Sequence, residues 1–235
     1  MPSRPSLGEQ WFRDLQAKPE AGQAAFLKSL VGSTPPTFED EWIDFKGADR
    51  ITLDGKDIQE IWSRALSGFA NTGGGVLVWG IDARKDKSTG VDCAVGLALA
   101  ANPSAHISRL KELQAQANDP PVQGVESLQC SDPADSGKGF VVCYVPESHF
   151  KPHRAEHSGK AFFIRVGDNF VQPNVALLRS MFYPRTSPWL WVEMASDFRP
   201  IGGPGMEILI EARVHNSGNA TANDVFLVVQ TDPQG

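Results

Sequence analysis

The feature that most constrains the fold is a helix that leads into a glycine-rich turn and then into a wholly apolar strand. Residues 57–69 place apolar side chains at helical spacing, and residues 71–75 read Asn-Thr-Gly-Gly-Gly. Residues 76–81 then read Val-Leu-Val-Trp-Gly-Ile. A continuous apolar run of this length, bounded by turn residues, predicts a buried strand. We therefore expect a central sheet with helices packed against it.

The glycines of this turn do not predict a phosphate loop. In P-loops and dinucleotide-binding turns a strand precedes the glycines and a helix follows them. Here the order is reversed, and no Lys-Ser or Lys-Thr pair follows residues 73–75. The end of a helix and a tight turn explain the glycines, so ATP is not expected as a cofactor.

The remaining elements alternate between helical and extended patterns. Residues 1–35 predict a helical segment that ends at Gly32 and the prolines after it. Strands are expected near residues 41–46, 138–146 and 161–167, and further helices near residues 106–113 and 174–181. This order predicts an α+β domain over residues 36–187, with a mixed sheet flanked by helices.

The pattern changes after Pro188. Residues 206–214 and 224–230 alternate apolar and polar positions on either side of a turn-forming segment. They predict a β-hairpin or two strands of a partial β-sandwich. The segment 188–235 is shorter than a full immunoglobulin-like sandwich of about 100 residues, so these strands either pack on the preceding domain or belong to a larger sandwich.

Charge and cysteine content narrow the class of protein. The 235 residues carry 22 basic and 28 acidic side chains, a net charge of −6, which argues against a general polyanion binder. No apolar run approaches the ~18 residues of a membrane span. No secretory signal is visible at the start, and the three cysteines form no C-x-x-C pair. We therefore expect a cytoplasmic protein without structural zinc.

One stretch departs from the acidic average. Residues 151–187 contain six basic and two acidic side chains, a net charge of +4. Lys151, His153, Arg154, Lys160 and Arg165 belong to it, with two phenylalanines at positions 162 and 163. Basic side chains of this kind hold phosphates and neighbouring aromatic rings can stack on bases. The alternative is a solvated surface of mixed charge.

Three carboxylates and a lysine form a second candidate site. Glu39, Asp44 and Lys46 lie at or near one predicted strand, and Asp82 directly follows the buried strand at residues 76–81. If the two strands are neighbours, the carboxylates converge on one edge of the sheet. Converging carboxylates suit Mg²⁺ or Mn²⁺, which can activate water against a phosphodiester. Surface acids at strand ends are the alternative interpretation.

Several short motifs together resemble the Schlafen AlbA-like domain. They are residues 39–46 (Glu-Asp-Glu-Trp-Ile-Asp-Phe-Lys), 69–75 (Phe-Ala-Asn-Thr-Gly-Gly-Gly), 145–148 (Val-Pro-Glu-Ser), 151–153 (Lys-Pro-His) and 163–168 (Phe-Ile-Arg-Val-Gly-Asp). They occur in the order and spacing of the family, over roughly residues 36–180. The Phe-Ala-Asn-Thr-Gly-Gly block is the most specific of them, and the whole resembles bacterial single-lobe members.

This resemblance implies that the protein acts on nucleic acid. Some Schlafen proteins cleave tRNA and rRNA with a divalent metal held by three carboxylates, which match Glu39, Asp44 and Asp82 here. Asp44 replaces the usual glutamate. The leading hypothesis is a metal-dependent endoribonuclease for structured RNA such as tRNA, in which Lys46 holds the scissile phosphate. Lys151, His153, Arg154, Lys160 and Arg165 would position the backbone.

The resemblance also leaves alternatives open. The chain has a single lobe, so a groove like that of the two-lobed vertebrate proteins requires a homodimer. Some bacterial relatives resemble anti-phage defence factors, and others are described as DNA-binding regulators. A non-catalytic DNA- or RNA-binding module is therefore the rival hypothesis, and a protein-interaction scaffold is a third. The zinc site of the vertebrate proteins is not matched by the cysteines of this chain.

Overall fold

The computed structural model describes residues 5–183, 188–203, 205–218 and 220–226. These residues divide into two compact units, Met1–Phe182 and Tyr183–Gly235. The first unit is a mixed α+β domain, as the sequence predicts. Its helices are α1 (Leu7–Gln16), α2 (Glu20–Ser29), α3 (Lys56–Ala70), α4 (Pro103–Ala117) and α5 (Val175–Phe182).

The first unit is built on a four-stranded sheet with the order β1-β2-β7-β6. The strands are β1 (Ile43–Lys46), β2 (Gly75–Trp79), β7 (Asp135–Val145) and β6 (Glu126–Asp132). β1 runs parallel to β2, with Asp44 opposite Leu77 and Lys46 opposite Trp79. β7 runs antiparallel to both β2 and β6. The sheet is therefore mixed, and the expected adjacency of the first two strands is confirmed.

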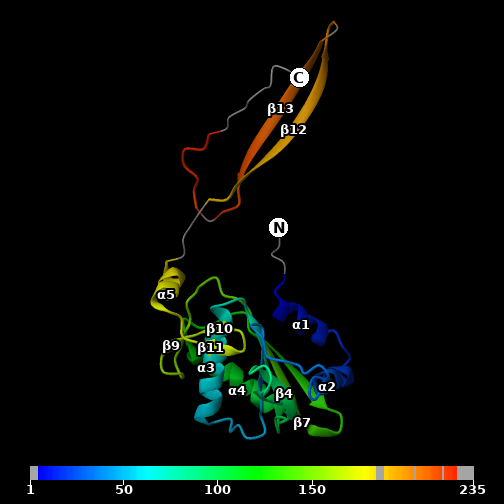
Figure 1. Cartoon of the computed structure of the whole chain (residues 1–235), viewed down its shortest axis with the longest axis vertical. Helices are drawn as coiled ribbons and strands as arrows, with labels where there is room; N and C mark the ends of the chain where they lie inside the picture. Colours follow the sequence, from blue (N-terminus) through cyan, green and yellow to red (C-terminus); the bar gives the residue numbers. More distant parts are fainter. Residues whose placement is uncertain (1–4, 184–187, 204, 219, 227–235) are drawn as a thin grey trace. The chain divides into compact units, whose positions relative to one another are not determined.

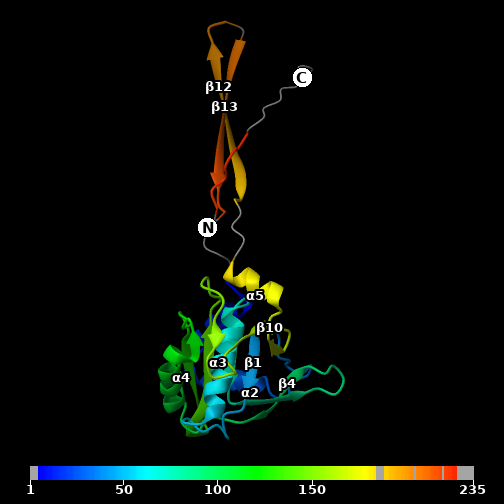
Figure 2. The ribbon, with the colours of Figure 1, turned by 90° about the vertical axis from the view of Figure 1, so that its left-hand side faces the viewer.

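Helices cover both faces of this sheet, because alternate side chains of a strand point to opposite sides. Leu77 and Trp79 pack in one cluster with residues of α3 and α4. Val76 and Val78 pack in another with residues of α1 and α2. Figures 1 and 2 show α3 and α4 on one side of the sheet and α1 and α2 on the other. The apolar run is thus a strand buried on both faces.

The glycine turn lets α3 end against the sheet. Gly74 has a φ of +75°, and its amide donates to the carbonyl of Phe69. A Cβ atom on Gly75 would lie 2.3 Å from the ring of Phe69. Only glycines therefore allow the helix end and β2 to approach this closely, which agrees with the interpretation of these glycines as a helix terminus.

Smaller sheets surround the central one. β3 (Ile81–Lys85) pairs with β4 (Asp92–Leu97), and β10 (Ile164–Val166) pairs with β11 (Asn169–Val171). β5 (Asn118–Asp119), β8 (Arg154–Ala155) and β9 (Ala161–Phe162) form a third small sheet. β9 and β10 together occupy the expected strand at residues 161–167. β3, β4, β5, β6, β8 and β11 were not predicted from the sequence, because their apolar alternation is weak.

The second unit contains an antiparallel hairpin of β12 (Leu190–Ile201) and β13 (Gly205–Asn216). The expected strand at 206–214 is present, but its partner is β12, which precedes it. The expected partner at 224–230 is not seen: residues 224–226 form no strand, and residues 227–230 lie outside the described residues. Paired residues share a face, so Val192, Met194, Phe198 and their partners form an exposed apolar face.

The described part of the chain contains no helix with the length and apolarity needed to cross a membrane.

Candidate functional site

The candidate site is a buried cluster of ion pairs beside the parallel strands β1 and β2. Asp44 and Lys46 come from β1, and Glu39 comes from the segment before it. The amide of Glu39 donates to the carbonyl of Asp92, at the start of β4. Arg165 enters from β10. Three segments that are distant in sequence therefore meet at the cluster: residues 39–46, the start of β4 and β10.

Arg165 is the centre of this cluster, and its side chain has no exposed surface. One terminal nitrogen, Nη1, donates to Asp44 Oδ1 at 2.7 Å. The other, Nη2, donates to Glu39 Oε2 at 3.2 Å and to the carbonyl of Ile43 at 2.9 Å. Nε donates to the carbonyl of Asp40. The guanidinium group is thereby used on every side, as a buried arginine requires.

Aromatic rings and α3 hold Arg165 in place. Its guanidinium carbon lies 4.5 Å from the ring centroid of Phe170 and 5.7 Å from that of Phe69. Cation–π contacts of this kind strengthen when water is excluded. The amide of Arg165 donates to Oγ1 of Thr72, directly after α3. The Phe-Ala-Asn-Thr block thus contributes Phe69 and Thr72 to the positioning of Arg165.

Lys46 connects the cluster to solvent. Its Nζ lies 2.7 Å from Asp44 Oδ2 and 3.9 Å from Glu39 Oε1. The side chain of Lys46 is 33% exposed, whereas those of Glu39 and Asp44 are 2% exposed. An external anion therefore meets Lys46 before it meets any other member of the cluster.

The carboxyl group of Glu39 is the most strongly perturbed group of the cluster. Burial raises its pKa to about 8, and the nearby Asp44 carboxylate adds to the rise. Lys46 and the amide of Phe45 oppose the shift. Glu39 is therefore largely protonated at pH 7, and Asp44 carries the negative charge that faces Arg165. With Glu39 neutral, the four side chains carry a net charge of +1.

A pocket of about 210 Å³ opens beside the cluster. Its lining residues are Glu39, Asp44, Lys46, Ile61, Arg64, Asp92, Arg165, Asp168, Asn169 and Phe170. Arg64 was not predicted from the sequence. It lies on α3, pairs with Glu60 and donates to Oγ of Ser158. The available signal was an arginine four residues after Glu60 on a predicted helix, a pattern that many exposed helices share.

Asp82 does not join this cluster. Gly80, with a φ of +114°, ends β2, and Asp82 belongs to β3, which pairs with β4 in a separate sheet. Asp82 lines another pocket of about 370 Å³, where it pairs with Arg84 at 3.1 Å. The turn at Gly80 thus redirects the chain between the buried strand and Asp82. The structure brings together Glu39, Asp44 and Lys46 but leaves Asp82 apart.

The cluster does not fit a divalent metal held by three carboxylates. Glu39 and Asp44 both face the guanidinium of Arg165, and Lys46 occupies the solvent side. A hard cation needs carboxylate oxygens that are free to coordinate it. Among the described residues, no group of three or more histidine, cysteine or acidic side chains is arranged to hold a metal ion.

The five basic-stretch residues take different positions. Arg165 and His153 are buried, at 2% and 1% exposure. Lys151 pairs with Glu147 and donates to the carbonyl of Thr72, and Arg154 pairs with Glu156 and Asp119. Lys160 is exposed and has a φ of +51°. Lys160 and the partly exposed Lys151 and Arg154 are thus the members that reach the surface.

Asn71 is a second residue whose role the sequence did not reveal. Its Nδ2 donates to the carbonyls of His153 and Phe163, and its Oδ1 accepts from the amide of His153. The end of α3 therefore binds two later segments: Asn71 holds the segment of His153, while Thr72 holds that of Arg165. The sequence shows only an asparagine at the end of a predicted helix, and this pattern by itself predicts no more than a helix cap.

The chain belongs to the Schlafen, AlbA_2 family, whose model matches residues 39–174, more than half of the chain. The match includes the ion-pair cluster and the end of α3, and it confirms the resemblance found in the sequence. No curated protein matches the chain.

Two solved structures are similar to parts of the chain. The DIP2311 protein from Corynebacterium diphtheriae is 18% identical with a TM-score of 0.36, and the match covers 57% of this chain and 26% of that protein. The chain thus spans about a quarter of its length. The second structure is the N-terminal domain of a protein from Nitrosomonas europaea described as related to the ATP-dependent DNA helicase RecG. It is 21% identical with a TM-score of 0.40, and the match covers 67% of this chain and 94% of that domain.

Proposed function

We propose that this domain binds nucleic acid and that Lys46 and Arg64 make its central phosphate contacts. The observation that carries the proposal is the surplus positive charge of the ion-pair cluster. Arg165 balances Asp44 from the interior, and Glu39 is largely neutral at pH 7 because burial raises its pKa to about 8. Lys46 pairs with Asp44 at 2.7 Å, but its side chain is 33% exposed, so it is the cation of the cluster that an external phosphate reaches first. Arg64 lines the same pocket.

The proposed target is structured RNA such as tRNA, with DNA as the alternative. Asp92 and Asp168 also line the pocket, and the whole chain has a net charge of −6. Loosely bound polyanion is therefore repelled, while a narrow backbone that reaches Lys46 is attracted. Lys151, Arg154 and Lys160 supply further phosphate contacts in this proposal, and two copies of the chain pair to cover a longer target.

Fluorescence anisotropy with labelled tRNA and with duplex DNA at several salt concentrations tests the proposal. Lys46→Met and Arg64→Met should each weaken binding and lower the slope of log K against log salt by about 1. Lys138→Met is the matched control, because this lysine is 53% exposed and lies outside the pocket. Unchanged affinity and slope in both pocket variants would contradict the proposal. Sedimentation with and without tRNA measures the pairing of copies.

A metal-dependent endoribonuclease is the second candidate. It is favoured because Glu39, Asp44 and Lys46, three of the residues that the family resemblance assigns to catalysis, line one pocket. This activity requires Asp82 as a third ligand of Mg²⁺ or Mn²⁺, and the described structure keeps Asp82 in another pocket. Incubation of tRNA with Mn²⁺ or with EDTA separates the two candidates. Discrete fragments that need both Mn²⁺ and Asp82 would favour the nuclease, whereas a gel shift with intact tRNA favours the binding domain.

The endoribonuclease test has a usable variant. Asp82→Asn keeps the size of a side chain that is 41% exposed, so it leaves the buried core unchanged. If cleavage occurs and Asp82→Asn cleaves as fast as the unchanged chain, Asp82 does not hold the metal.

A part in anti-phage defence belongs to the same proposal. Plaque counts on cells with and without the protein measure it.

A further inference from the structure

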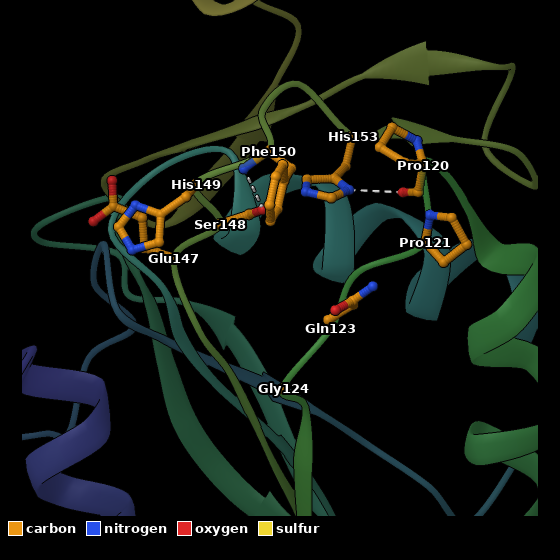
Figure 3. A pocket seen from close by; sticks show the side chains of 9 residues that line it. All are labelled: Pro120, Pro121, Gln123, Gly124, Glu147, Ser148, His149, Phe150 and His153. Carbon is orange, nitrogen blue, oxygen red and sulfur yellow. Dashed lines mark hydrogen bonds between the residues drawn. The ribbon is translucent and has the colours of Figure 1, made fainter. Parts of the chain in front are cut away.

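A third pocket, with a volume of about 600 Å³, shares no lining residue with the pocket beside the ion-pair cluster. Figure 3 shows Pro120, Pro121 and Gln123 on one side and the segment from Glu147 to Phe150 on the other, with His153 between them. Of the nine described residues that line it, only Glu147 has an acidic or strongly basic side chain. The pocket therefore suits an uncharged ligand with apolar faces.

His153 presents one unsatisfied nitrogen in this pocket. The residue is 1% exposed, and its Nδ1 lies 2.7 Å from the carbonyl oxygen of Pro120. A carbonyl oxygen only accepts, so Nδ1 carries the proton. Burial lowers the pKa of His153, which keeps the ring neutral near pH 7. Nε2 is then an acceptor, and it is buried without a hydrogen-bond partner.

A buried acceptor without a partner is unfavourable, so a ligand that donates a hydrogen bond to Nε2 gains affinity. In Figure 3 this edge of the His153 ring faces away from Pro120, toward the ring of Phe150. Phe150 is 77% exposed, although it is one of the largest apolar side chains of the unit. Exposed aromatic rings beside a pocket are typical stacking surfaces for flat ligands. Nε2 itself is buried, so a ligand reaches it by displacing a neighbouring side chain such as that of the exposed Phe150.

From these contacts we infer that the pocket binds an amino-bearing nucleobase, with adenine as the best match. The exocyclic amino group donates to Nε2 of His153, and the ring stacks on Phe150. The side-chain amide of Gln123 can pair with the hydrogen-bonding edge of adenine. The choice of a nucleobase rests on the proposed function, since the pocket chemistry alone requires only a flat ligand with an N–H donor. The phosphates lie outside, because Glu147 is the charged group of the lining.

The ligand itself provides the sharpest test, because a His153 variant would also lose the bond to Pro120. Adenosine monophosphate and purine riboside monophosphate differ only in the exocyclic amino group. NMR titration of the full chain should show about tenfold tighter binding of adenosine monophosphate. Phe150→Ala should weaken both ligands about tenfold. Phe198→Ala, at a phenylalanine of the hairpin that is also exposed, should leave both unchanged. Equal affinity for the two ligands, or unchanged binding by Phe150→Ala, would overturn the inference.

A single-stranded oligonucleotide with one 2-aminopurine tests whether the base can come from a nucleic-acid strand. Stacking on Phe150 should quench the fluorescence, and Phe150→Ala should remove that quenching. An oligonucleotide that binds without a fluorescence change, together with equal affinities for the two monophosphates, overturns the base pocket and leaves the proposed function standing. Discrimination between the monophosphates without any binding of tRNA or oligonucleotide supports the pocket and contradicts the proposed function.

Discussion

The pocket beside Arg165 and the pocket beside His153 differ in how their buried polar groups are satisfied. Beside β1, Arg165 is surrounded by acceptors, and both carboxylates that face it are in ion pairs. Beside Pro120, the ring of His153 has one satisfied nitrogen and one without a partner. A buried guanidinium that donates from all three of its nitrogens mainly supports the fold, whereas an unpaired buried nitrogen beside a pocket leaves a place for a ligand.

Both pockets depend on the end of α3. Thr72 accepts from the amide of Arg165, and Asn71 binds the backbone of His153 on both its donor and acceptor sides. The effects of substitutions in the two pockets on the free energy of unfolding can therefore be compared within one domain.

The largest expected effect is the loss of Arg165. Arg165→Met leaves Glu39 and Asp44 buried without their guanidinium, so the free energy of unfolding should fall by about 3–5 kcal/mol. Urea denaturation measures the change. Arg84→Met is the control: its side chain is 74% exposed, and it should change stability by less than about 0.5 kcal/mol. A loss below about 1 kcal/mol for Arg165→Met would show that the cluster is not a structural centre.

A combined variant separates charge from packing. Arg165→Met together with Glu39→Gln and Asp44→Asn removes the charges of Arg165 and Asp44 and the ionisable carboxyl group of Glu39 at once. Buried ion pairs can be replaced by neutral groups at little cost, so this variant should recover much of the stability that Arg165→Met loses. If it is less stable than Arg165→Met alone, the carboxylates contribute independently of the arginine.

The second effect is a pH dependence assigned to Glu39. Its pKa is about 8 in the folded protein, against an ordinary value of 4.5. The folded state therefore holds a proton that the unfolded state has lost, and the corresponding stability is complete below pH 4.5 and lost as pH rises through 8.

Glu39→Gln removes this contribution. Relative to the unchanged chain, the variant should gain stability between pH 5 and pH 8, on the order of a few kcal/mol. Urea denaturation of the variant and of the unchanged chain at pH 5 and pH 8 measures the difference in free energy of unfolding. Other titrating groups contribute equally to both chains and cancel in this difference. A constant difference across this range would mean that Glu39 is ionised in the fold.

The third effect concerns the connection between the pockets. Asn71→Ala leaves the buried carbonyls of His153 and Phe163 and the amide of His153 without their partner, and should cost about 2–3 kcal/mol. Asn169→Ala, at an exposed asparagine, should change stability little. Faster hydrogen exchange of the His153 amide in Asn71→Ala would locate the loss. An unchanged exchange rate would contradict the clamping role.

The smallest effect belongs to the pocket beside His153. Phe150→Ala should change the free energy of unfolding by less than about 0.5 kcal/mol, because the side chain is 77% exposed. This pocket can therefore be altered without unfolding the domain, in contrast to the pocket at Arg165. A loss above about 1.5 kcal/mol in thermal or urea denaturation would show that Phe150 supports the core instead.

Local patterns predicted the elements that carry strong periodicity. The apolar spacing of residues 57–69 and the run at residues 76–81 correspond to α3 and β2. The residue pattern and the resemblance placed Glu39, Asp44, Lys46 and Asp82 in one site. The structure brings the first three together and leaves Asp82 in another pocket. By contrast, β3 and β4 carry mixed polar residues, and β12, which pairs with β13, was not predicted.

The sequence by itself determined the mixed α+β class, the buried strand and the family, because these depend on periodicity and on short motifs. Only the tertiary structure decided that Arg165 is buried between two carboxylates, that Gly80 turns Asp82 away from them, and that His153 has an unpaired nitrogen. Burial and pairing depend on segments more than 100 residues apart, such as Asp44 and Arg165. No local pattern encodes such a contact, because only packing of the whole domain excludes water from it.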